Sequence, residues 1–398
     1  MPIRLGNKAD GDDFFDRVNE RADLWRHLEG NHVVLSGPRR LGKTSLLQRL
    51  AEEAPGHGLV ARLEDVGGLD TAAAFIDALD RAVADETIAG HLRTAGKPMR
   101  DWMARVRKVG LHLPGDLGAG IEIQAPSEAA WSAKARRLQQ RLSAAPVLLL
   151  IDEVSVFLEK ALGRDATDTV RLLSWLRAWR QHSGLTCRFL FSGSIGLNAL
   201  LDRHGLSTYF NDCYDLRLGP FKERAALEML QTQCQREGWT PDPATLAHLC
   251  ERAGWLSPFY LNLLLDTALS AARDRRQETG AEAPLLLPGD VDDAYDRLLA
   301  VRSRFIHWYQ RLERDLAPPD LAFTLRILGV VATAEDGLTR RQLLARLNRQ
   351  EPDPDRRAAR LDDAMIGLEE DGYLAVTGER IAFPSFILRD YWRRNHAR

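Results

Sequence analysis

The sequence feature that most constrains the fold is a short apolar run followed by a glycine-rich turn and an amphipathic stretch. The apolar run, Val33 to Leu35, is typical of a buried parallel strand, and the turn has the spacing Gly37-x4-Gly42-Lys43-Thr44. Glycines let backbone amides turn inward around phosphate oxygens, and the helix that follows adds its unpaired N–H groups. This is the pattern of a phosphate-binding loop (P-loop). It predicts contacts to a nucleoside triphosphate from Gly37, Pro38, Arg39, Arg40, Leu41, Gly42, Lys43, Thr44 and Ser45.

The side chains of this loop have separate expected roles. Lys43 is expected to reach the β- and γ-phosphates, and the hydroxyl of Thr44 is expected to ligate Mg²⁺. Arg39 and Arg40 allow two interpretations, contact with phosphate or ion pairs with nearby carboxylates. The alternative for the whole loop is a glycine-rich turn that binds no ligand.

A second apolar run ends in an acidic pair. Val147 to Ile151 precedes Asp152 and Glu153, and two helical patterns separate this run from the P-loop, as a parallel sheet requires. Asp152 is expected to bind Mg²⁺ through water, and Glu153 to polarise the attacking water. The alternative is that the pair only caps the next helix.

A third apolar run, Arg188 to Phe191, ends in Ser192-Gly193-Ser194. In a parallel sheet of this kind, a polar residue at the tip of this strand lies between the metal-binding carboxylates and the γ-phosphate. We therefore expect Ser192 or Ser194 to sense whether that phosphate is present. The alternative is a serine-glycine turn without ligand contact.

Length and composition limit the remaining possibilities. With 398 residues the chain exceeds the size of one hydrophobic core, so about two or three domains are expected. The net charge of −2 gives no overall basic field, and nucleic-acid binding would need a local patch. The four cysteines form no CxxC pair, which favours free thiols in a reducing cytosol. No apolar run approaches the ~20 residues that span a bilayer, so we expect a cytoplasmic protein without a membrane segment.

Taken in order, these segments resemble the archaeal-type ATPases of the signal-transduction (STAND) branch of the AAA+ superfamily. The resemblance rests on the following segments: FDRVNE from Phe15, GPRRLGKTSLL from Gly37, VLLLIDEV from Val147, FLFSGS from Phe189, LGPF from Leu218 and GWLSPFYL from Gly254. It implies an ATP- and Mg²⁺-binding ATPase in which Phe15 and Arg17 lie against the adenine. It also implies that Pro258 approaches the nucleotide from a helical lid, and that lid and sheet change their angle between ADP and ATP states.

One departure from this family concerns the arginine that often follows the third strand's loop. The corresponding stretch reads Ser207 to Asp212, with Asn211 near the expected place. Arg203, Arg217 or an arginine of a neighbouring protomer could substitute. Since loss of such an arginine lowers the rate by about 10³–10⁵-fold, slow hydrolysis is expected.

The sequence pattern divides the chain into three predicted domains. Residues 1–218 form an α/β P-loop ATPase domain with a parallel sheet between helices, residues 219–315 a helical lid, and residues 316–398 a winged helix-turn-helix domain. Helical periodicity in the lid covers Glu223–Glu237, Pro243–Arg252 and Pro258–Arg275. Between the P-loop helix and the acidic pair, residues 99–109 have a basic helical face and residues 112–124 resemble a hairpin.

The predicted winged helix allows two interpretations. Thr339 is a suitable N-cap for its middle helix, and the next helix starts at Arg356. That helix carries three arginines but also five acidic residues, which are Asp362, Asp363, Glu369, Glu370 and Asp371. A helix that enters the DNA major groove needs the opposite balance of charge, so packing or partner docking is the main interpretation and DNA contact is the alternative.

The sequence therefore predicts a Mg²⁺-dependent ATP-binding ATPase that acts as a nucleotide-governed switch and signals to a protein partner. Its partners would be ATP or ADP, a protein of unknown identity, DNA if the winged helix binds it, and other copies in a nucleotide-dependent oligomer. One alternative is a DNA-binding regulator, or an accessory protein of a mobile element or defence system, that uses ATP for assembly on DNA. Another is a non-hydrolysing scaffold with structural nucleotide.

Overall fold

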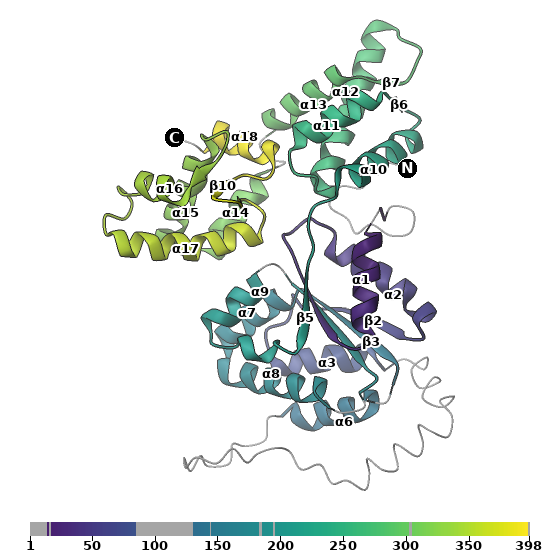
Figure 1. Cartoon of the computed structure of the whole chain (residues 1–398), viewed down its shortest axis with the longest axis vertical. Coiled ribbons are helices and arrows are strands. Elements are labelled where there is room, and N and C mark those ends of the chain that lie inside the picture. Colours follow the sequence, from purple (N-terminus) through teal and green to yellow (C-terminus); the bar gives the residue numbers. More distant parts are fainter. Residues whose placement is uncertain are drawn as a thin grey trace.

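A computed structural model describes residues 14–15, 17–84, 130–143, 145–182, 185–193, 196–301 and 305–396, without the side chains of residues 196, 199, 307 and 315. Ser194, the basic helical face at 99–109 and the hairpin at 112–124 lie outside the described residues. Figure 1 shows a sheet flanked by helices, a helical region beyond it, and a C-terminal region beside both.

The first part of the chain is built on a five-stranded parallel sheet with the strand order β2-β3-β4-β1-β5. All residues of the two strands that carry the predicted motifs are buried, as continuous apolar runs require. The strands are β1 (His32–Ser36), β2 (Val60–Asp65), β3 (Val147–Asp152), β4 (Arg188–Ser192) and β5 (Cys213–Arg217). The predicted α/β P-loop fold is confirmed.

Helices cover both faces of this sheet because successive strand residues point to opposite sides. Val33 and Leu35 pack with the apolar faces of α1 and α2, whereas Val34 and Leu149 pack with those of α3, α7 and α8. These helices are α1 (Val18–Leu28), α2 (Lys43–Glu53), α3 (Ala72–Ala82), α6 (Ser132–Leu142), α7 (Val154–Arg164), α8 (Ala166–Arg180) and α9 (Gly196–Arg203), with 3₁₀ turns η2 (Ala54–His57) and η3 (Ser207–Tyr209).

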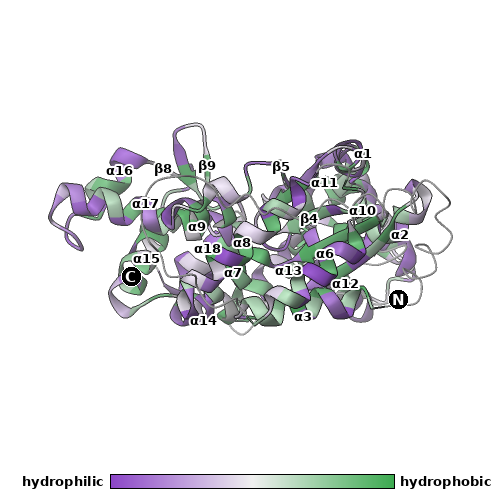
Figure 2. Ribbon diagram, turned by 90° about the horizontal axis from the view of Figure 1, so that it is seen from below, coloured by the Kyte–Doolittle hydropathy of each residue, from purple (hydrophilic) through white to green (hydrophobic). Residues whose placement is uncertain are grey.

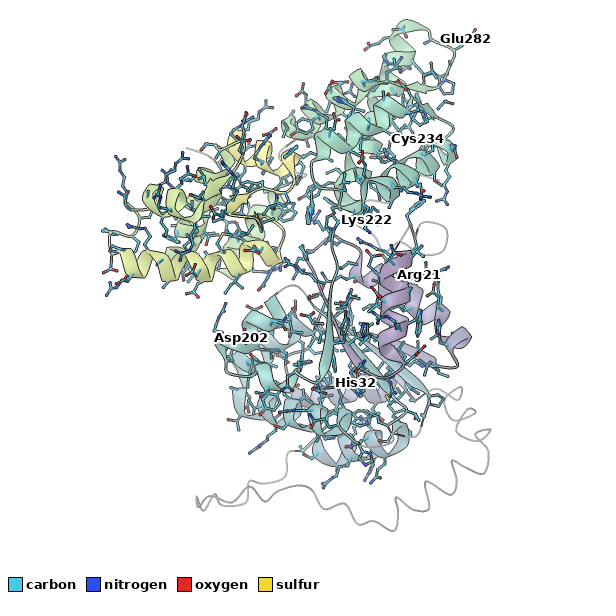
Figure 3. All side chains as sticks on the ribbon, in the orientation of Figure 1. Arg21, His32, Asp202, Lys222, Cys234 and Glu282 are labelled. Atoms are coloured by element: carbon cyan, nitrogen blue, oxygen red, sulfur yellow. The ribbon has the colours of Figure 1, made fainter. Side chains whose placement is uncertain are left out.

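The strand β5 leads directly into a helical region. Lys222, just before its first helix, lies where the two parts join (Figure 3). The helices are α10 (Glu223–Arg236), α11 (Pro243–Ala253), α12 (Pro258–Thr279) and α13 (Pro288–Ala300), with a small parallel pair β6 (Thr240–Pro241) and β7 (Leu285–Leu286). α12 continues past the predicted end at Arg275 and stops at Gly280, whose φ of 67° ends the helix.

The C-terminal region combines helices with a three-stranded antiparallel sheet in the order β8-β10-β9. Its elements are α14 (Ile306–Asp315), α15 (Pro318–Ala332), β8 (Leu338–Thr339), α16 (Arg340–Arg346), α17 (Pro354–Glu370), β9 (Ala375–Thr377), β10 (Arg380–Ala382) and α18 (Phe386–Asn395). Thr339 caps α16 as predicted. Its hydroxyl accepts from the N–H of Gln342, and the amide oxygen of Gln342 accepts from the N–H of Thr339.

Hydrophobic residues concentrate between the helices and strands, with hydrophilic residues on the outer turns (Figure 2). One buried cluster runs from α1 and the sheet through the lid helices to α18. Among the helices of the described residues, none is long and apolar enough to cross a membrane.

His32, at the start of β1, is a buried structural histidine far from the P-loop end of the strand (Figure 3). The N–H of Phe189 donates to its Nδ1 at 3.2 Å, so its Nε2 carries the proton and donates to the Arg180 carbonyl at 3.2 Å. Burial lowers its pKa to about 4, because a charged imidazole would lose solvation there. Only the neutral ring satisfies both partners.

This arrangement predicts an acid-sensitive stability. The unfolded chain protonates His32 near pH 6.5, but the folded chain resists protonation down to about pH 4. Lowering the pH through this window should therefore remove up to about 3 kcal/mol of stability. We expect the thermal midpoint of His32→Gln to depend less on pH between 7 and 5 than that of the wild type. The exposed His204→Gln is the control, and equal slopes for all three proteins would contradict the assignment.

Candidate nucleotide-binding site

The backbone of the P-loop depends on its two glycines. Gly37 follows β1 with a φ of 153°, and a Cβ atom there would lie 2.7 Å from the carbonyl oxygen of Leu218. Leu218 is fixed in that place because its N–H donates to the Ser36 carbonyl at 2.7 Å. Gly42, with a φ of 88°, precedes the first turn of α2. Side chains larger than hydrogen would be strained at both positions.

Lys43 is buried, and its ammonium folds back into the loop. Nζ donates to the carbonyl oxygens of Gly37 at 2.7 Å and Pro38 at 3.0 Å. Burial lowers the pKa of Lys43 to about 8, while the carboxylates of Glu153 and Asp152 act in the opposite direction. The loop therefore holds a cation at its centre, with two carboxylates close enough to stabilise it.

The acidic pair meets the P-loop at Thr44. The Thr44 hydroxyl donates to Oδ2 of Asp152 at 2.6 Å, and Oδ1 accepts from the N–H of Glu153 at 3.0 Å. Glu153 stands at the N-cap of α7 with a φ of 58°, but its side chain makes no capping hydrogen bond. The Glu153 side chain therefore does not cap this helix, and the role of the pair at a metal stays a prediction. A hydroxyl and a carboxylate oxygen side by side are ligands that Mg²⁺ prefers in proteins.

Ser192 lies at the tip of β4, the strand between β3 and β1, and pairs in register with Leu35. It is fully buried, and its hydroxyl has no hydrogen-bond partner among the described residues. A buried hydroxyl without a partner is unusual, since desolvating it costs about 1–3 kcal/mol. This position fits the predicted phosphate-sensing role, which stays a prediction.

The predicted adenine-side residues lie around the outer side of the loop. Arg17 is almost fully buried, donates to the Leu41 carbonyl at 3.1 Å, and lies 4.7 Å from the ring of Phe221. Phe15 is half-buried, and its ring lies 5.5 Å from the guanidinium of Arg236 on α10. The leading segment therefore links the P-loop to the lid, and its contact with adenine stays a prediction.

Pro258 is the first residue of α12, at the base of the lid. The hydroxyl of the preceding Ser257 does not cap this helix. It donates to the carbonyl oxygen of Arg40 at 2.8 Å. The lid is thus joined to the P-loop by a partly buried hydrogen bond, which puts Pro258 next to a residue that contacts the loop.

Arg39 pairs with one carboxylate and one backbone carbonyl of the C-terminal region. Its Nε lies 2.8 Å from Oδ1 of Asp371, and its backbone N–H donates to the carbonyl oxygen of Glu370 at 3.3 Å. Nε of Arg311, on α14, donates to the other carboxylate oxygen of Asp371 at 2.7 Å. Of the two interpretations of Arg39, this structure shows the ion pair.

Arg40 inserts between aromatic rings. Its φ is 66°, and its guanidinium carbon lies 3.7 Å from the ring centre of Phe259 on α12 and 4.9 Å from that of Trp308 on α14. Cation–π attraction of this kind strengthens when the cation is desolvated, and burial also lowers the pKa of Arg40. Arg40 therefore ties the loop to both downstream regions.

Arg203 and Arg217 are the candidate substitutes for the arginine that related ATPases often place near the γ-phosphate. Both lie near the C-terminal end of α17, which carries Glu369 and Glu370. Burial raises the pKa of Glu369 and brings that of Glu370 to about 7, while the charges of Arg217 and Arg203 act in the opposite direction. Asn211 is not at this edge. It precedes β5, which runs parallel to β1, so it lies at the end of the sheet opposite the P-loop.

Four further residues of this neighbourhood had not been predicted from the sequence: Ser257, Phe259, Trp308 and Asp371. The Ser-Pro pair at the start of α12 was a local signal for the first. The others carry no local signal, because their contacts with the P-loop arginines join segments that are distant in sequence.

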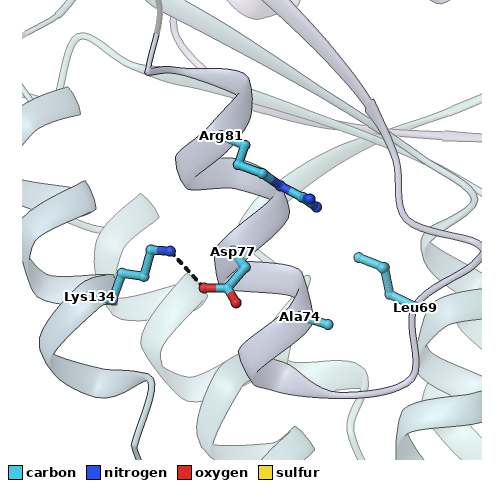
Figure 4. A pocket seen from close by; sticks show the side chains of 5 residues that line it. All are labelled: Leu69, Ala74, Asp77, Arg81 and Lys134. Atoms are coloured by element: carbon cyan, nitrogen blue, oxygen red, sulfur yellow. Dashed lines mark hydrogen bonds and ion pairs between the residues drawn. The ribbon is translucent and has the colours of Figure 1, made fainter.

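Figure 4 shows an open pocket of about 260 Å³ beside α3, lined by Leu69, Ala74, Asp77, Arg81 and Lys134. The Lys134 ammonium donates to the Asp77 carboxylate at 2.7 Å, and Asp80 lies 3.3 Å away. The lysine's charge is therefore already neutralised by carboxylates, and we do not assign this pocket a ligand.

The parallel sheet order, the P-loop after β1 and the acidic pair after β3 define an AAA+ P-loop NTPase fold, followed by a helical region. Two solved structures are similar over nearly the whole chain. The Walker-type ATPase PABY2304 of Pyrococcus abyssi has a TM-score of 0.63 and 17% identity, covering 99% of this chain and 100% of that one. The Aeropyrum pernix ORC2 protein, in ADPNP–ADP complexes, has a TM-score of 0.54 and 13% identity, covering 96% and 95%. No protein-family model and no curated protein sequence matches the chain.

The close approach at Gly37 predicts that Gly37→Ala destabilises the protein by about 1–3 kcal/mol, since a Cβ atom would collide with the Leu218 backbone. Gly68→Ala is the matched control, because a Cβ atom there meets nothing within 4 Å. Thermal midpoints of the two variants measure the difference. Equal midpoints would mean that the loop does not depend on this contact.

Proposed function

We propose that the chain is a Mg²⁺-dependent ATP-binding protein and ATPase of the STAND/AAA+ type, acting as a nucleotide-governed switch that signals to a protein partner. The observation that carries this proposal is the 2.6 Å hydrogen bond between Thr44 and Asp152, beside the buried ammonium of Lys43. Two sequence-distant elements thereby bring a cation for phosphate and oxygen ligands for Mg²⁺ to one place. A turn without ligands would not need this convergence.

The chain's own residues divide the work of hydrolysis. Bound ATP would supply the triphosphate, and Mg²⁺ would neutralise part of its charge. Lys43 would exchange its carbonyl partners, Gly37 and Pro38, for phosphate oxygens, and Thr44 and Asp152 are the residues that would hold the metal. Glu153 orients the attacking water and accepts its proton at the carboxylate.

Hydrolysis is slow in this proposal. The stretch in which related ATPases often carry an arginine for the γ-phosphate has Asn211 instead, and Asn211 lies at the end of the sheet opposite the P-loop. An arginine from another copy, in a nucleotide-dependent oligomer, would then complete the site. Slow turnover suits a switch, because the ATP state lasts long enough to be recognised.

The C-terminal region docks onto protein in this proposal, as a winged helix whose α17 does not contact DNA. Two of the three arginines of α17 are engaged within the chain: Arg357 donates to the Glu351 carbonyl at 2.8 Å, and Arg360 pairs with Asp320 at 3.3 Å. Arg340 is likewise paired with Asp362 of α17 at 2.9 Å. Arg340, Arg357 and Arg360 are therefore held by groups of the chain itself, whereas DNA contact would need them at phosphates.

Phosphate release from the purified full chain, alone and with double-stranded DNA, tests this function. We expect Mg²⁺-dependent release that falls to background in Lys43→Ala. In Glu153→Gln the release should fall by about 10²–10⁴-fold while ATP still binds, because only the proton acceptor is lost. Lys222→Ala, an exposed lysine between sheet and lid, is the matched control and should retain the wild-type rate.

The alternatives give different results in the same experiment. Tight ATP binding with background release, unchanged by Glu153→Gln, would identify a non-hydrolysing scaffold. Salt-dependent DNA binding that persists in Lys43→Ala would favour a DNA-binding regulator, or an accessory protein of a mobile element or defence system.

A further inference from the structure

We propose that Arg39 is a phosphate-responsive latch residue, which holds the acidic end of α17 on the P-loop through Asp371 and releases it when the γ-phosphate of ATP takes the guanidinium. The acidic end is defined as Glu369, Glu370 and Asp371. The inference rests on the proposed function, since it assigns a regulatory partner to the same nucleotide site.

Both the backbone N–H and the guanidinium of Arg39 contact the acidic end of α17. Its backbone N–H donates to the Glu370 carbonyl at 3.3 Å, and its guanidinium lies 2.8 Å from the Asp371 carboxylate. Inward-turned amides and an arginine fork are the groups that bind phosphate at such a loop. They cannot serve the protein carboxylate and a phosphate together, so docking of α17 and binding of the γ-phosphate exclude one another at Arg39.

The acidic end presents the Asp371 carboxylate to Arg39 of the P-loop. Three consecutive acidic residues lie close to the arginines that line the edge. Arg39 contacts Asp371, while Arg203 and Arg217 are near enough to Glu370 and Glu369 to act on their ionisation. Of these contacts, the ion pair between Arg39 and Asp371 is the direct one.

Release of Arg39 leaves no unpaired buried charge. Asp371 is shared between Arg39 and Arg311, and the second arginine donates to it at 2.7 Å. When Arg39 turns to phosphate, Asp371 therefore keeps a partner within its own region. Breaking a shared, partly exposed pair costs far less than exposing a lone buried carboxylate, so the latch can open and close.

The residues next to Asp371 pack closely against the lid and the P-loop, and this packing positions the C-terminal region. A Cβ atom on Gly372 would lie 2.9 Å from the indole of Trp255 in the lid and 3.6 Å from Cβ of Pro38. Helix α17 also packs against α9 of the sheet domain (Figure 1). A loosened acidic end therefore changes how the C-terminal region sits on both neighbours.

Mutual exclusion has a measurable consequence. If the latch is closed in most molecules, the apparent affinity for a γ-phosphate is reduced by the fraction of molecules that are open. ADP lacks that phosphate and is affected less. The ratio of the ADP Kd to the Kd of a non-hydrolysable ATP analogue therefore reports the latch.

Calorimetric titration of the full chain with ADP and with the analogue gives this ratio. We expect Asp371→Asn to raise it by about two- to fivefold, the range for a partly exposed charge pair. Asp362→Asn is the matched control, since it makes the same change in the exposed Arg340–Asp362 pair. In an Arg39→Gln background, Asp371→Asn should change nothing. A wild-type ratio in Asp371→Asn, or an equal rise without Arg39, would overturn the proposal.

Hydrogen exchange on the wild type gives a second test that needs no variant to fold. We expect the analogue, but not ADP, to increase amide exchange at residues 368–374, where the acidic end leaves the P-loop. Binding of both nucleotides with unchanged exchange and an unchanged ratio would remove the latch and keep the proposed function. Absence of binding by either nucleotide would remove the proposed function itself.

Discussion

The rest of the structure depends on the hydrogen bond between the Thr44 hydroxyl and the Asp152 carboxylate. Thr44 follows β1 and Asp152 is the last residue of β3, and they meet because the carboxyl ends of parallel strands share one edge of the sheet. The intervening strand β4 brings the buried hydroxyl of Ser192 to the same edge. A buried carboxylate needs partners, and Asp152 has the Thr44 hydroxyl, the Glu153 amide and the Lys43 cation. The strand order therefore creates the site.

The P-loop is also the place where three parts of the chain join. Ser257 of the lid donates to the carbonyl of Arg40, the Arg40 guanidinium lies between lid and α14 rings, and Arg39 pairs with Asp371. Packed interfaces of this kind shift between discrete arrangements because they do not deform continuously. A ligand that changes the backbone of the P-loop therefore acts directly on the contacts with the lid and with the C-terminal region.

Much of this fold could be predicted from local patterns. The apolar runs before Gly37, Glu153 and Ser192 are all parallel strands, and Thr339 forms the predicted cap. Local reasoning failed where the outcome depended on register or packing. Asn211 was expected near the nucleotide, but it precedes a parallel strand and so lies at the opposite edge. Helix α12 extends beyond Arg275, since its polar residues are compatible with helix until Gly280.

The sequence by itself determined the P-loop, the acidic pair and the order of helices and strands, because spacing and periodicity are properties of neighbouring residues. Only the tertiary structure decided the partners of Arg39 and Arg40. A basic side chain in a loop can pair with any carboxylate or ring within reach, and which ones are within reach depends on how whole regions pack. Asp371 and Trp308 became partners of the loop because the C-terminal region folds back onto the sheet edge.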